Sequence, residues 1–226
     1  MRMEEERTLI AEYGRKMSTM GLSQGTSGNI SIYDKNSGLM AISPSGVDYM
    51  DIRPEDVVVM DLNGNVVESD RKPSSECNLH AGFYRAYGEQ GCGAVVHTHS
   101  NYATTLACMG EPIRAVHYSI SGAGVHEIPL CGYTTFGTPE LAEMAVAACK
   151  GSRAVTLANH GLVAYGVDLK RAFGLASSLE NVAKIQWQCL CTGRMNVLTK
   201  EQIDDVMIRL QTYGQKAAKD GSQNAY

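Results

Sequence analysis

Two histidines stand two residues apart, at His97 and His99, directly after the apolar run 94–96. Side chains alternate across a β-strand, so residues i and i+2 point to the same side of it. If the run forms a strand, both imidazoles can reach one metal ion. The chain has only six histidines, which makes the pair informative, although a chance pair in a loop gives the same pattern.

A third histidine, His160, ends another apolar stretch and is followed by Gly161. Catalytic zinc sites typically use three protein ligands and leave a position for water or substrate. Residues of functional sites gather at strand ends and in the loops that follow them. We therefore predict that His97, His99 and His160 can hold a metal ion. His80 lies one turn after Glu76 in a predicted helix, and we interpret it as a helix residue rather than a ligand.

Three short loops are rich in hydroxyl groups and glycine: 25–29, 43–46 and 72–75. The third leads into the start of a predicted helix, where the positive end of the helix dipole favours an anion. Each loop alone could be an ordinary turn. Beside a candidate metal site, the three together favour a substrate that carries phosphate. None of them matches a P-loop or a dinucleotide fingerprint, so nucleotide binding is not indicated.

Composition excludes several classes of function. The net charge is −4 over 226 residues, and no basic run suggests a nucleic-acid partner. No stretch is apolar for long enough to span a bilayer, and the start of the chain is too charged for a signal peptide. We therefore expect a cytoplasmic protein with no nucleic-acid or membrane partner. The seven cysteines then fit reduced thiols better than a disulfide framework.

The elements that must position these residues alternate between helix and strand. Expected helices cover 4–20, 102–109 and 168–192, with others beginning near residues 76, 138 and 199; expected strands cover 30–33, 39–42, 57–61, 66–67, 94–97, 154–157 and 161–164. Residues 63–64, Asn-Gly, mark a hairpin. The pattern predicts one α/β domain over residues 1–226, built on a mixed, largely antiparallel sheet. The tail from about residue 217 is expected to be frayed.

Five motifs occur in an order that resembles a known family. They are QGTSGNIS at 24–31, SPSG at 43–46, PSSE at 73–76, VHTH at 96–99 and NHGL at 159–162. The chain resembles the class II aldolase/adducin family over nearly its whole length, including segments 116–118, 133–138 and 212–214. Within that family the motifs are most similar to those of aldolases acting on L-fuculose 1-phosphate. The resemblance implies a three-layer fold with helices on both faces of the sheet.

The resemblance also implies a reaction: zinc-dependent, reversible cleavage of a ketose 1-phosphate to dihydroxyacetone phosphate and an aldehyde such as L-lactaldehyde. His97, His99 and His160 would bind one Zn²⁺ per subunit. Glu76 would bind the metal at rest and act as general base or acid once substrate displaces it. Breaking the carbon–carbon bond leaves an enediolate, which a divalent cation stabilises without a Schiff-base lysine.

Further roles follow from the same resemblance. Tyr118 would donate a proton to the aldehyde oxygen, and Tyr213 would close over the site. The protein would be a homotetramer with its sites at subunit interfaces. The residues expected to bind the substrate's phosphate are Thr26, Gly28, Asn29, Ser45, Gly46, Ser74 and Ser75.

Other reactions fit the same scaffold. A 5-deoxypentulose-phosphate aldolase would carry the same catalytic residues. The family's epimerases resemble this chain but place an aspartate where Glu76 stands, which favours aldol cleavage. A sugar-phosphate decarboxylase or dehydratase is a further alternative. A non-catalytic adducin-like module is disfavoured because the three histidines and Glu76 are all present.

Overall fold

The computed structural model describes residues 1–213, and the tail expected to fray from about residue 217 lies outside them. Its centre is an eight-stranded sheet in the order β4-β3-β2-β1-β5-β10-β9-β8. The strands are β1 Asn29–Asp34, β2 Leu39–Ile42, β3 Val58–Asp61, β4 Val66–Glu68, β5 Ala94–Thr98, β8 Leu130–Cys131, β9 Ala154–Leu157 and β10 Gly161–Gly166. Neighbouring strands are antiparallel except for the parallel pair β8–β9. The predicted mixed, largely antiparallel sheet is confirmed.

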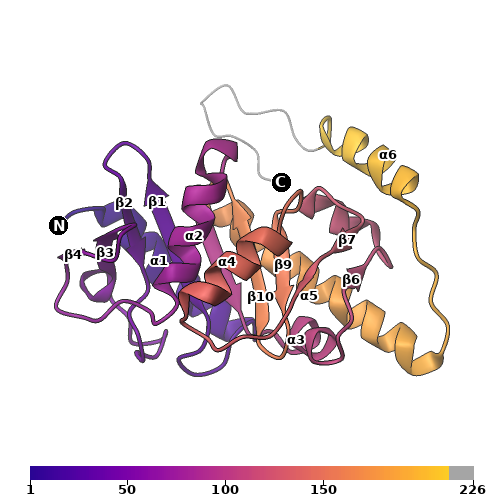
Figure 1. Cartoon of the computed structure of the whole chain (residues 1–226), viewed down its shortest axis with the longest axis horizontal. Helices are drawn as coiled ribbons and strands as arrows, with labels where there is room; N and C mark the ends of the chain where they lie inside the picture. Colours follow the sequence, from indigo (N-terminus) through magenta and orange to yellow (C-terminus); the bar gives the residue numbers. More distant parts are fainter. Residues whose placement is uncertain (214–226) are drawn as a thin grey trace.

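Helices cover both faces of this sheet (Figure 1). The helices are α1 Glu4–Thr19, α2 Cys77–Tyr87, α3 Asn101–Cys108, α4 Pro139–Ala148, α5 Leu169–Thr192 and α6 Lys200–Leu210. Helices α2 and α4 pack on one face in one apolar cluster, and α1, α3 and α5 pack on the other face in a second cluster. The three-layer expectation is therefore correct.

Strand β5 lies at the middle of the sheet and is buried along its whole length. Val95 packs toward α2 and α4, whereas Ala94 and Val96 pack toward α1, α3 and α5. Burial on both faces explains why the segment reads as a continuous apolar run. The alternation turns the side chain of His97 to the same face as that of Val95, beneath α2.

Helix starts follow the expected capping chemistry. The side chains of Thr138, Asp168 and Thr199 each accept a hydrogen bond from a backbone N–H three residues later. Strands β6 Ile113–Arg114, β7 Glu127–Ile128 and β8, and the 3₁₀ segment Tyr118–Ala123, were not expected. Two-residue strands are too short to produce a periodic pattern.

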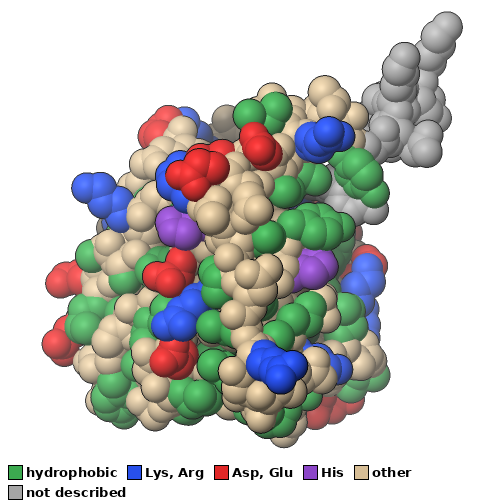
Figure 2. Space-filling view, turned by 90° about the vertical axis from the view of Figure 1, so that its right-hand side faces the viewer, with side chains coloured by type: hydrophobic (Ala, Val, Ile, Leu, Met, Phe, Trp, Pro, Cys, Tyr) green, Lys and Arg blue, Asp and Glu red, His purple; other side chains and the backbone are tan. Residues whose placement is uncertain are grey.

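Charged side chains of both signs are mixed on one face of the molecule (Figure 2), and the described helices are not of the membrane-spanning kind. On the face shown in Figure 2, Lys and Arg side chains are interspersed with Asp and Glu side chains rather than gathered in one area. Among residues 1–213, no helix combines the length and the apolar character needed to cross a bilayer.

Candidate metal centre and adjoining pocket

Four side chains meet on the α2 side of β5: Glu76, His97, His99 and His160. The Nε2 atom of His97 lies 3.0 Å from Nε2 of His99 and 3.3 Å from Nε2 of His160. The Glu76 carboxylate reaches the same point, with Oε2 3.2 Å from His97 Nε2 and Oε1 3.3 Å from His160 Nε2. The ligand atoms all lie within 4.8 Å of one another, so a single cation could contact all four.

Three parts of the fold place these four residues. Glu76 stands at the N-terminus of α2, His97 lies in β5 and His99 follows the strand's last residue. His160 occupies the short turn between β9 and β10. The residue before it, Asn159, adopts a left-handed conformation with φ of 55°, which asparagine tolerates better than most residues.

Gly161 allows the β9–β10 turn to approach β5. A Cβ atom at this position would lie 2.3 Å from the Thr98 carbonyl oxygen and 3.1 Å from Cδ2 of His99. Any larger residue would therefore push directly on the histidine cluster. The glycine after His160 is a requirement of close packing at the candidate metal centre.

The hydrogen bonding of the ligands fits a metal ion. Nδ1 of His97 lies 3.0 Å from the Leu162 carbonyl oxygen, which can only accept, so Nδ1 carries the proton. Nε2 of a neutral His97 then presents its lone pair to the cluster, the arrangement usual for metal-ligating histidines. Oε1 of Glu76 is buried and accepts no hydrogen bond from any described residue. A divalent cation would satisfy both atoms.

Burial and charge set the ionisation of the group. Burial raises the pKa of Glu76, but His97, Asn29 and His160 outweigh it and hold that pKa well below its usual range. Burial lowers the pKa of His97, but the Glu76 carboxylate and the Leu162 carbonyl leave it raised. Burial and the neighbouring His97 lower the pKa of His99 to about 3 and that of His160 to about 4. His99 and His160 are therefore neutral near pH 7, as ligands must be.

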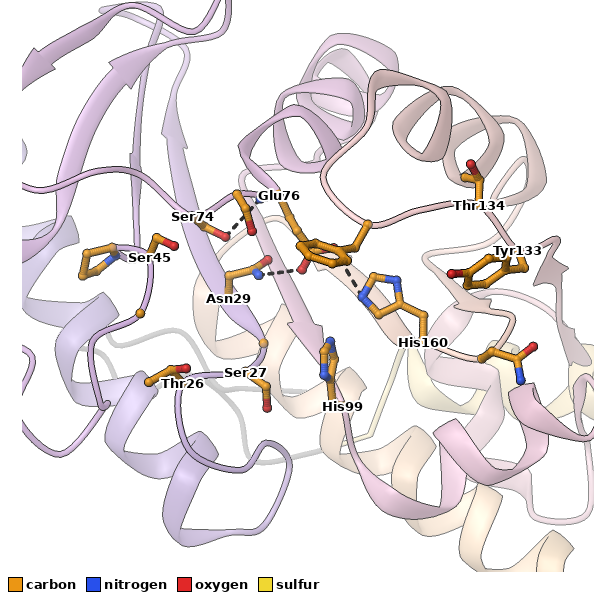
Figure 3. Close-up of a pocket in the computed structure, with 16 residues that line it drawn as sticks. Thr26, Ser27, Asn29, Ser45, Ser74, Glu76, His99, Tyr133, Thr134 and His160 are labelled. Carbon is orange, nitrogen blue, oxygen red and sulfur yellow. Dashed lines mark hydrogen bonds and ion pairs between the residues drawn. The ribbon is translucent and has the colours of Figure 1, made fainter.

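A pocket of about 310 Å³ opens beside the cluster. Its lining comprises Thr26, Ser27, Gly28, Asn29, Pro44, Ser45, Gly46, Ser74, Ser75, Glu76, His99, Tyr133, Thr134, Phe136, Asn159 and His160. Figure 3 shows the hydroxyl side chains of Thr26, Ser45 and Ser74 at one end and Tyr133 and Thr134 at the other, with Glu76 and His99 between them. The pocket therefore has a polar end and a partly aromatic end.

Backbone hydrogen bonds hold the loops of the polar end together. Ser45 N donates to the Lys72 carbonyl at 3.0 Å, and Ser74 N donates to the Ser43 carbonyl at 3.1 Å. Gly28 has φ of +71°, and a Cβ there would lie 2.8 Å from the His97 carbonyl oxygen. No Lys or Arg of residues 1–213 lines the pocket. An anion there would be bound by hydroxyls and backbone N–H groups.

The expected site residues divide into two groups. Every residue expected at the phosphate lines the pocket, as do Glu76, His99 and His160, whereas His97 belongs to the same cluster but is fully buried and does not line the pocket. The structure does not bring Tyr118 or Tyr213 to this pocket: they are exposed by 54% and 67% and are absent from its described lining.

Sequence reasoning missed several lining residues, above all Tyr133, Phe136 and Asn159. Tyr133 and Phe136 are 66% and 63% exposed, which is unusual for aromatic side chains. They lie in one of the segments where the chain resembles the family, but their residue types alone indicated no role. The amide of Asn29 was assigned to phosphate, whereas its Nδ2 donates to Glu76 Oε2 at 2.9 Å.

Comparison with known families decides the relationship. Residues 8–187 match the family described as Class II Aldolase and Adducin N-terminal domain. The chain belongs to the class II aldolase and adducin family. Curated relatives that it matches over most of its length are named aldolases, and the protein is a class II aldolase, a carbon–carbon lyase.

The relatives of this class II aldolase are similar over most of their length. A 5-deoxy-D-ribulose 1-phosphate aldolase of Bacillus thuringiensis serovar kurstaki is 43% identical over 96% of this chain and 100% of its own. The L-fuculose phosphate aldolase of Haemophilus influenzae is 38% identical over 88% of this chain and 90% of its own. A solved L-fuculose 1-phosphate aldolase superposes with a TM-score of 0.87 at 40% identity, covering 92% of this chain and 96% of that one.

Proposed function

We propose that this class II aldolase catalyses the zinc-dependent, reversible cleavage of a deoxyketose 1-phosphate to dihydroxyacetone phosphate and a methyl-ended aldehyde. One observation carries the proposal. Three imidazoles and a buried carboxylate converge between the polar and the aromatic ends of one pocket. A ketose 1-phosphate with a deoxygenated end has the same order: an anion, then hydroxyl and carbonyl oxygens, then an apolar methyl group.

His97, His99, His160 and Glu76 hold the ion, one per subunit. When bound, Zn²⁺ supplies a Lewis acid that stabilises the negative charge developing on the ketose oxygens. No lysine of residues 1–213 lines the pocket, so the described chain offers no Schiff-base nucleophile there. The chemistry therefore depends on acid–base groups beside the ion.

Glu76 is the group that moves the proton. Its Oε1 is buried without a hydrogen-bond donor from the described residues, and the carboxylate lines the pocket. With the ion bound to substrate oxygens, Glu76 would be free to exchange a proton with the carbon that remains in dihydroxyacetone phosphate.

The polar end binds phosphate. Thr26, Ser45, Ser74 and Ser75 offer hydroxyls, and Gly28, Asn29 and Gly46 offer backbone or amide N–H groups. Ser75 stands just before the N-terminus of α2, where the helix dipole favours an anion.

Tyr118 and Tyr213 complete the aldehyde end from a neighbouring subunit of a homotetramer. Support comes from their exposure, 54% and 67%, and from the exposed aromatics Tyr133 and Phe136 at the rim of the same pocket. In this arrangement Tyr118 relays the proton of the ketose hydroxyl to solvent as the bond breaks, and its phenol donates a proton to the aldehyde oxygen in the reverse, bond-forming direction. Sedimentation velocity of the purified protein measures the assembly, and a monomer with full activity would contradict it.

Two candidate substrates differ in the aldehyde that they release. The relatives' names point to 5-deoxy-D-ribulose 1-phosphate and to L-fuculose phosphate, which differ in the length and hydroxylation of the part beyond the broken bond. The higher identity of the first relative, 43% against 38%, favours 5-deoxyribulose 1-phosphate as the better substrate. Its cleavage releases acetaldehyde, whereas L-fuculose 1-phosphate releases lactaldehyde.

A product screen tests the proposal. The protein is incubated with each of the two ketose 1-phosphates and with ribulose 5-phosphate, with and without chelator. We expect dihydroxyacetone phosphate and the matching aldehyde from the ketose 1-phosphates, and loss of both products with chelator. Formation of an epimer without any aldehyde, or cleavage unaffected by chelator after metal analysis finds no zinc, would overturn the proposal.

A further inference from the structure

A row of buried polar side chains runs away from Glu76 between β1 and α2. The Asn29 amide donates to Glu76 Oε2, and its Oδ1 lies 2.5 Å from Nε2 of His80. Nδ1 of His80 lies 2.6 Å from Ser31 Oγ, which lies 2.5 Å from the Tyr84 hydroxyl. The members are 5%, 0%, 0% and 2% exposed in the order Asn29, His80, Ser31 and Tyr84.

The donor and acceptor of every bond in this row can be assigned. Asn29 uses an N–H on the carboxylate, so its Oδ1 must accept and His80 Nε2 must donate. The His80 side chain is 0% exposed, and burial disfavours the charged imidazolium, so the ring is neutral and its Nδ1 accepts. Ser31 therefore donates to His80, and Tyr84 donates to Ser31. Every donor points along the row toward Glu76.

The spacing of the two elements makes the row possible. Asn29 and Ser31 are two apart on β1 and face the same side, about 6.7 Å from each other along the strand. Glu76 precedes the first residue of α2, and His80 and Tyr84 lie within the helix. Successive members of this set are four residues apart, which is about 6 Å along the helix axis. The two repeats match closely, so strand and helix side chains alternate: Glu76, Asn29, His80, Ser31, Tyr84.

We propose that Asn29, His80, Ser31 and Tyr84 are positioning residues that fix the rotation of the Glu76 carboxylate, an inference that rests on the proposed function of Glu76. Oε2 is held by the row, and Oε1 is left free of hydrogen bonds from described residues. A carboxylate that alternates between ligand and proton carrier needs one fixed oxygen and one available oxygen. A fully satisfied buried network supplies that rigidity.

The His80 tautomer tests the assigned direction without any enzyme assay. Protein labelled with ¹⁵N at histidine is examined by NMR near pH 7, and the His80 signals are identified by their loss in His80→Gln. We expect a neutral ring protonated on Nε2. A ring protonated on Nδ1, or on both nitrogens, would overturn the assignment, whatever the substrate proves to be.

Kinetics test the positioning role. His80→Leu removes both hydrogen bonds at similar volume, whereas the Gln side chain can donate to Asn29 and accept from Ser31. We expect His80→Leu to lower kcat roughly 10- to 100-fold, the usual range for groups that orient ligands, with KM little changed, and His80→Gln to recover most of the loss. Equal kcat values for His80→Leu and wild type, or a Gln variant as impaired as the Leu variant, would overturn the role.

Two tyrosines provide a matched pair should His80→Leu fail to fold. Tyr84→Phe removes the far end of the row, and Tyr87→Phe removes a hydroxyl of the same helix that donates to the Val146 carbonyl at 2.6 Å. We expect Tyr84→Phe to reduce kcat several-fold and to weaken zinc binding in competition with a chromophoric chelator, and Tyr87→Phe to leave both unchanged. Equal effects of the two variants would overturn the role. If wild type cleaves no ketose phosphate, the proposed function fails, while the tautomer and zinc-competition results still decide this inference.

Discussion

Glu76 presents its two carboxylate oxygens to different neighbours. Oε2 receives the Asn29 amide at 2.9 Å and lies 3.2 Å from His97 Nε2, whereas Oε1 faces His160 Nε2 at 3.3 Å. At the scale of the single residue, the two oxygens therefore differ in role: Oε2 is held in place by Asn29, and Oε1 is available for chemistry. Burial raises its pKa, but His97, Asn29 and His160 outweigh burial and hold that pKa low, so in the resting protein it is a carboxylate ready to bind a cation.

Glu76→Gln tests the proton-transfer role. The amide has nearly the same shape but cannot accept a proton, so we expect turnover to fall by roughly two to four orders of magnitude. Zinc content and phosphate binding should be kept. Steady-state kinetics and metal analysis on the same sample give both quantities. Turnover within a few-fold of wild type would remove Glu76 from the proton transfer.

Gly161→Ala tests the close approach behind His160. The added methyl would lie 2.3 Å from the Thr98 carbonyl oxygen and 3.1 Å from His99 Cδ2. We expect a loss of about 1–3 kcal/mol in the free energy of unfolding and weaker zinc binding. Gly174→Ala is the control, because a Cβ there meets nothing within 4 Å and alanine favours the helix interior. Equal urea midpoints for the two variants would contradict the packing argument.

Helix α3 follows the ligand His99 almost directly and is capped from another element. Ser100 at its N-cap makes no side-chain cap hydrogen bond. Instead, Glu180 of α5 accepts from Tyr102 N and Ala103 N, both at 2.9 Å. At the scale of elements, α5 thus fixes the start of α3 and with it the segment that carries His99.

Glu180→Ala should therefore cost about 1–2 kcal/mol of unfolding free energy, the range for losing a helix cap. Glu143→Ala is the control, because Glu143 is an exposed residue of α4 and surface changes of this kind usually stay within about 0.5 kcal/mol. Chemical denaturation of both variants is the measurement. An effect of Glu180→Ala no larger than the control's would show that the start of α3 is stable without it.

The sequence predicted the long elements well because their signals are local. Apolar periodicity and caps at Thr138, Asp168 and Thr199 depend on neighbouring residues alone. The i, i+2 pair His97 and His99 could be interpreted in the same way. Strand β8, the parallel partner of β9, gave no signal, because its pairing depends on residues distant in the chain.

The same distinction explains the site. The composition of loops 25–29, 43–46 and 72–75 indicated the polar end of the pocket, and residue type and spacing indicated the candidate metal ligands. Tyr133, Phe136 and Asn159 join the pocket only because separate loops meet there, which no local pattern encodes. The row of hydrogen bonds from Asn29 to Tyr84 joins a strand to a helix, and its bonded partners are 47 residues or more apart in the sequence. Predicting it would have required matching the two-residue repeat of the strand to the four-residue repeat of the helix.

At the scale of the whole molecule, the candidate metal centre joins parts that are far apart in the chain. Its ligands come from the start of α2, from the end of β5 and from the β9–β10 turn. A cation there binds the folded chain and not the unfolded one, so it stabilises by mass action. The ligand quartet can therefore contribute to global stability as well as to chemistry.

Metal removal should lower the unfolding temperature of the entire protein. With free zinc near 1,000 times its dissociation constant, the stabilisation is about 4 kcal/mol, or roughly 8–16 °C for a chain of this size. Differential scanning calorimetry with zinc, with chelator and with zinc restored measures it. Identical transitions in all three samples would mean that the four side chains hold no ion.

The pairing of β1 with β5 places Asn29 directly opposite His97. A slip of one residue would turn Asn29 and Ser31 toward α1 and bring Ile30 beneath α2. Polar side chains would then enter an apolar layer, and Asn29 would no longer reach Glu76, so both the packing of the sheet and the geometry of the metal centre would be lost. During refolding, zinc capture should therefore appear in the same kinetic phase as the native sheet, and the metal can serve as a reporter of strand register in newly made chains.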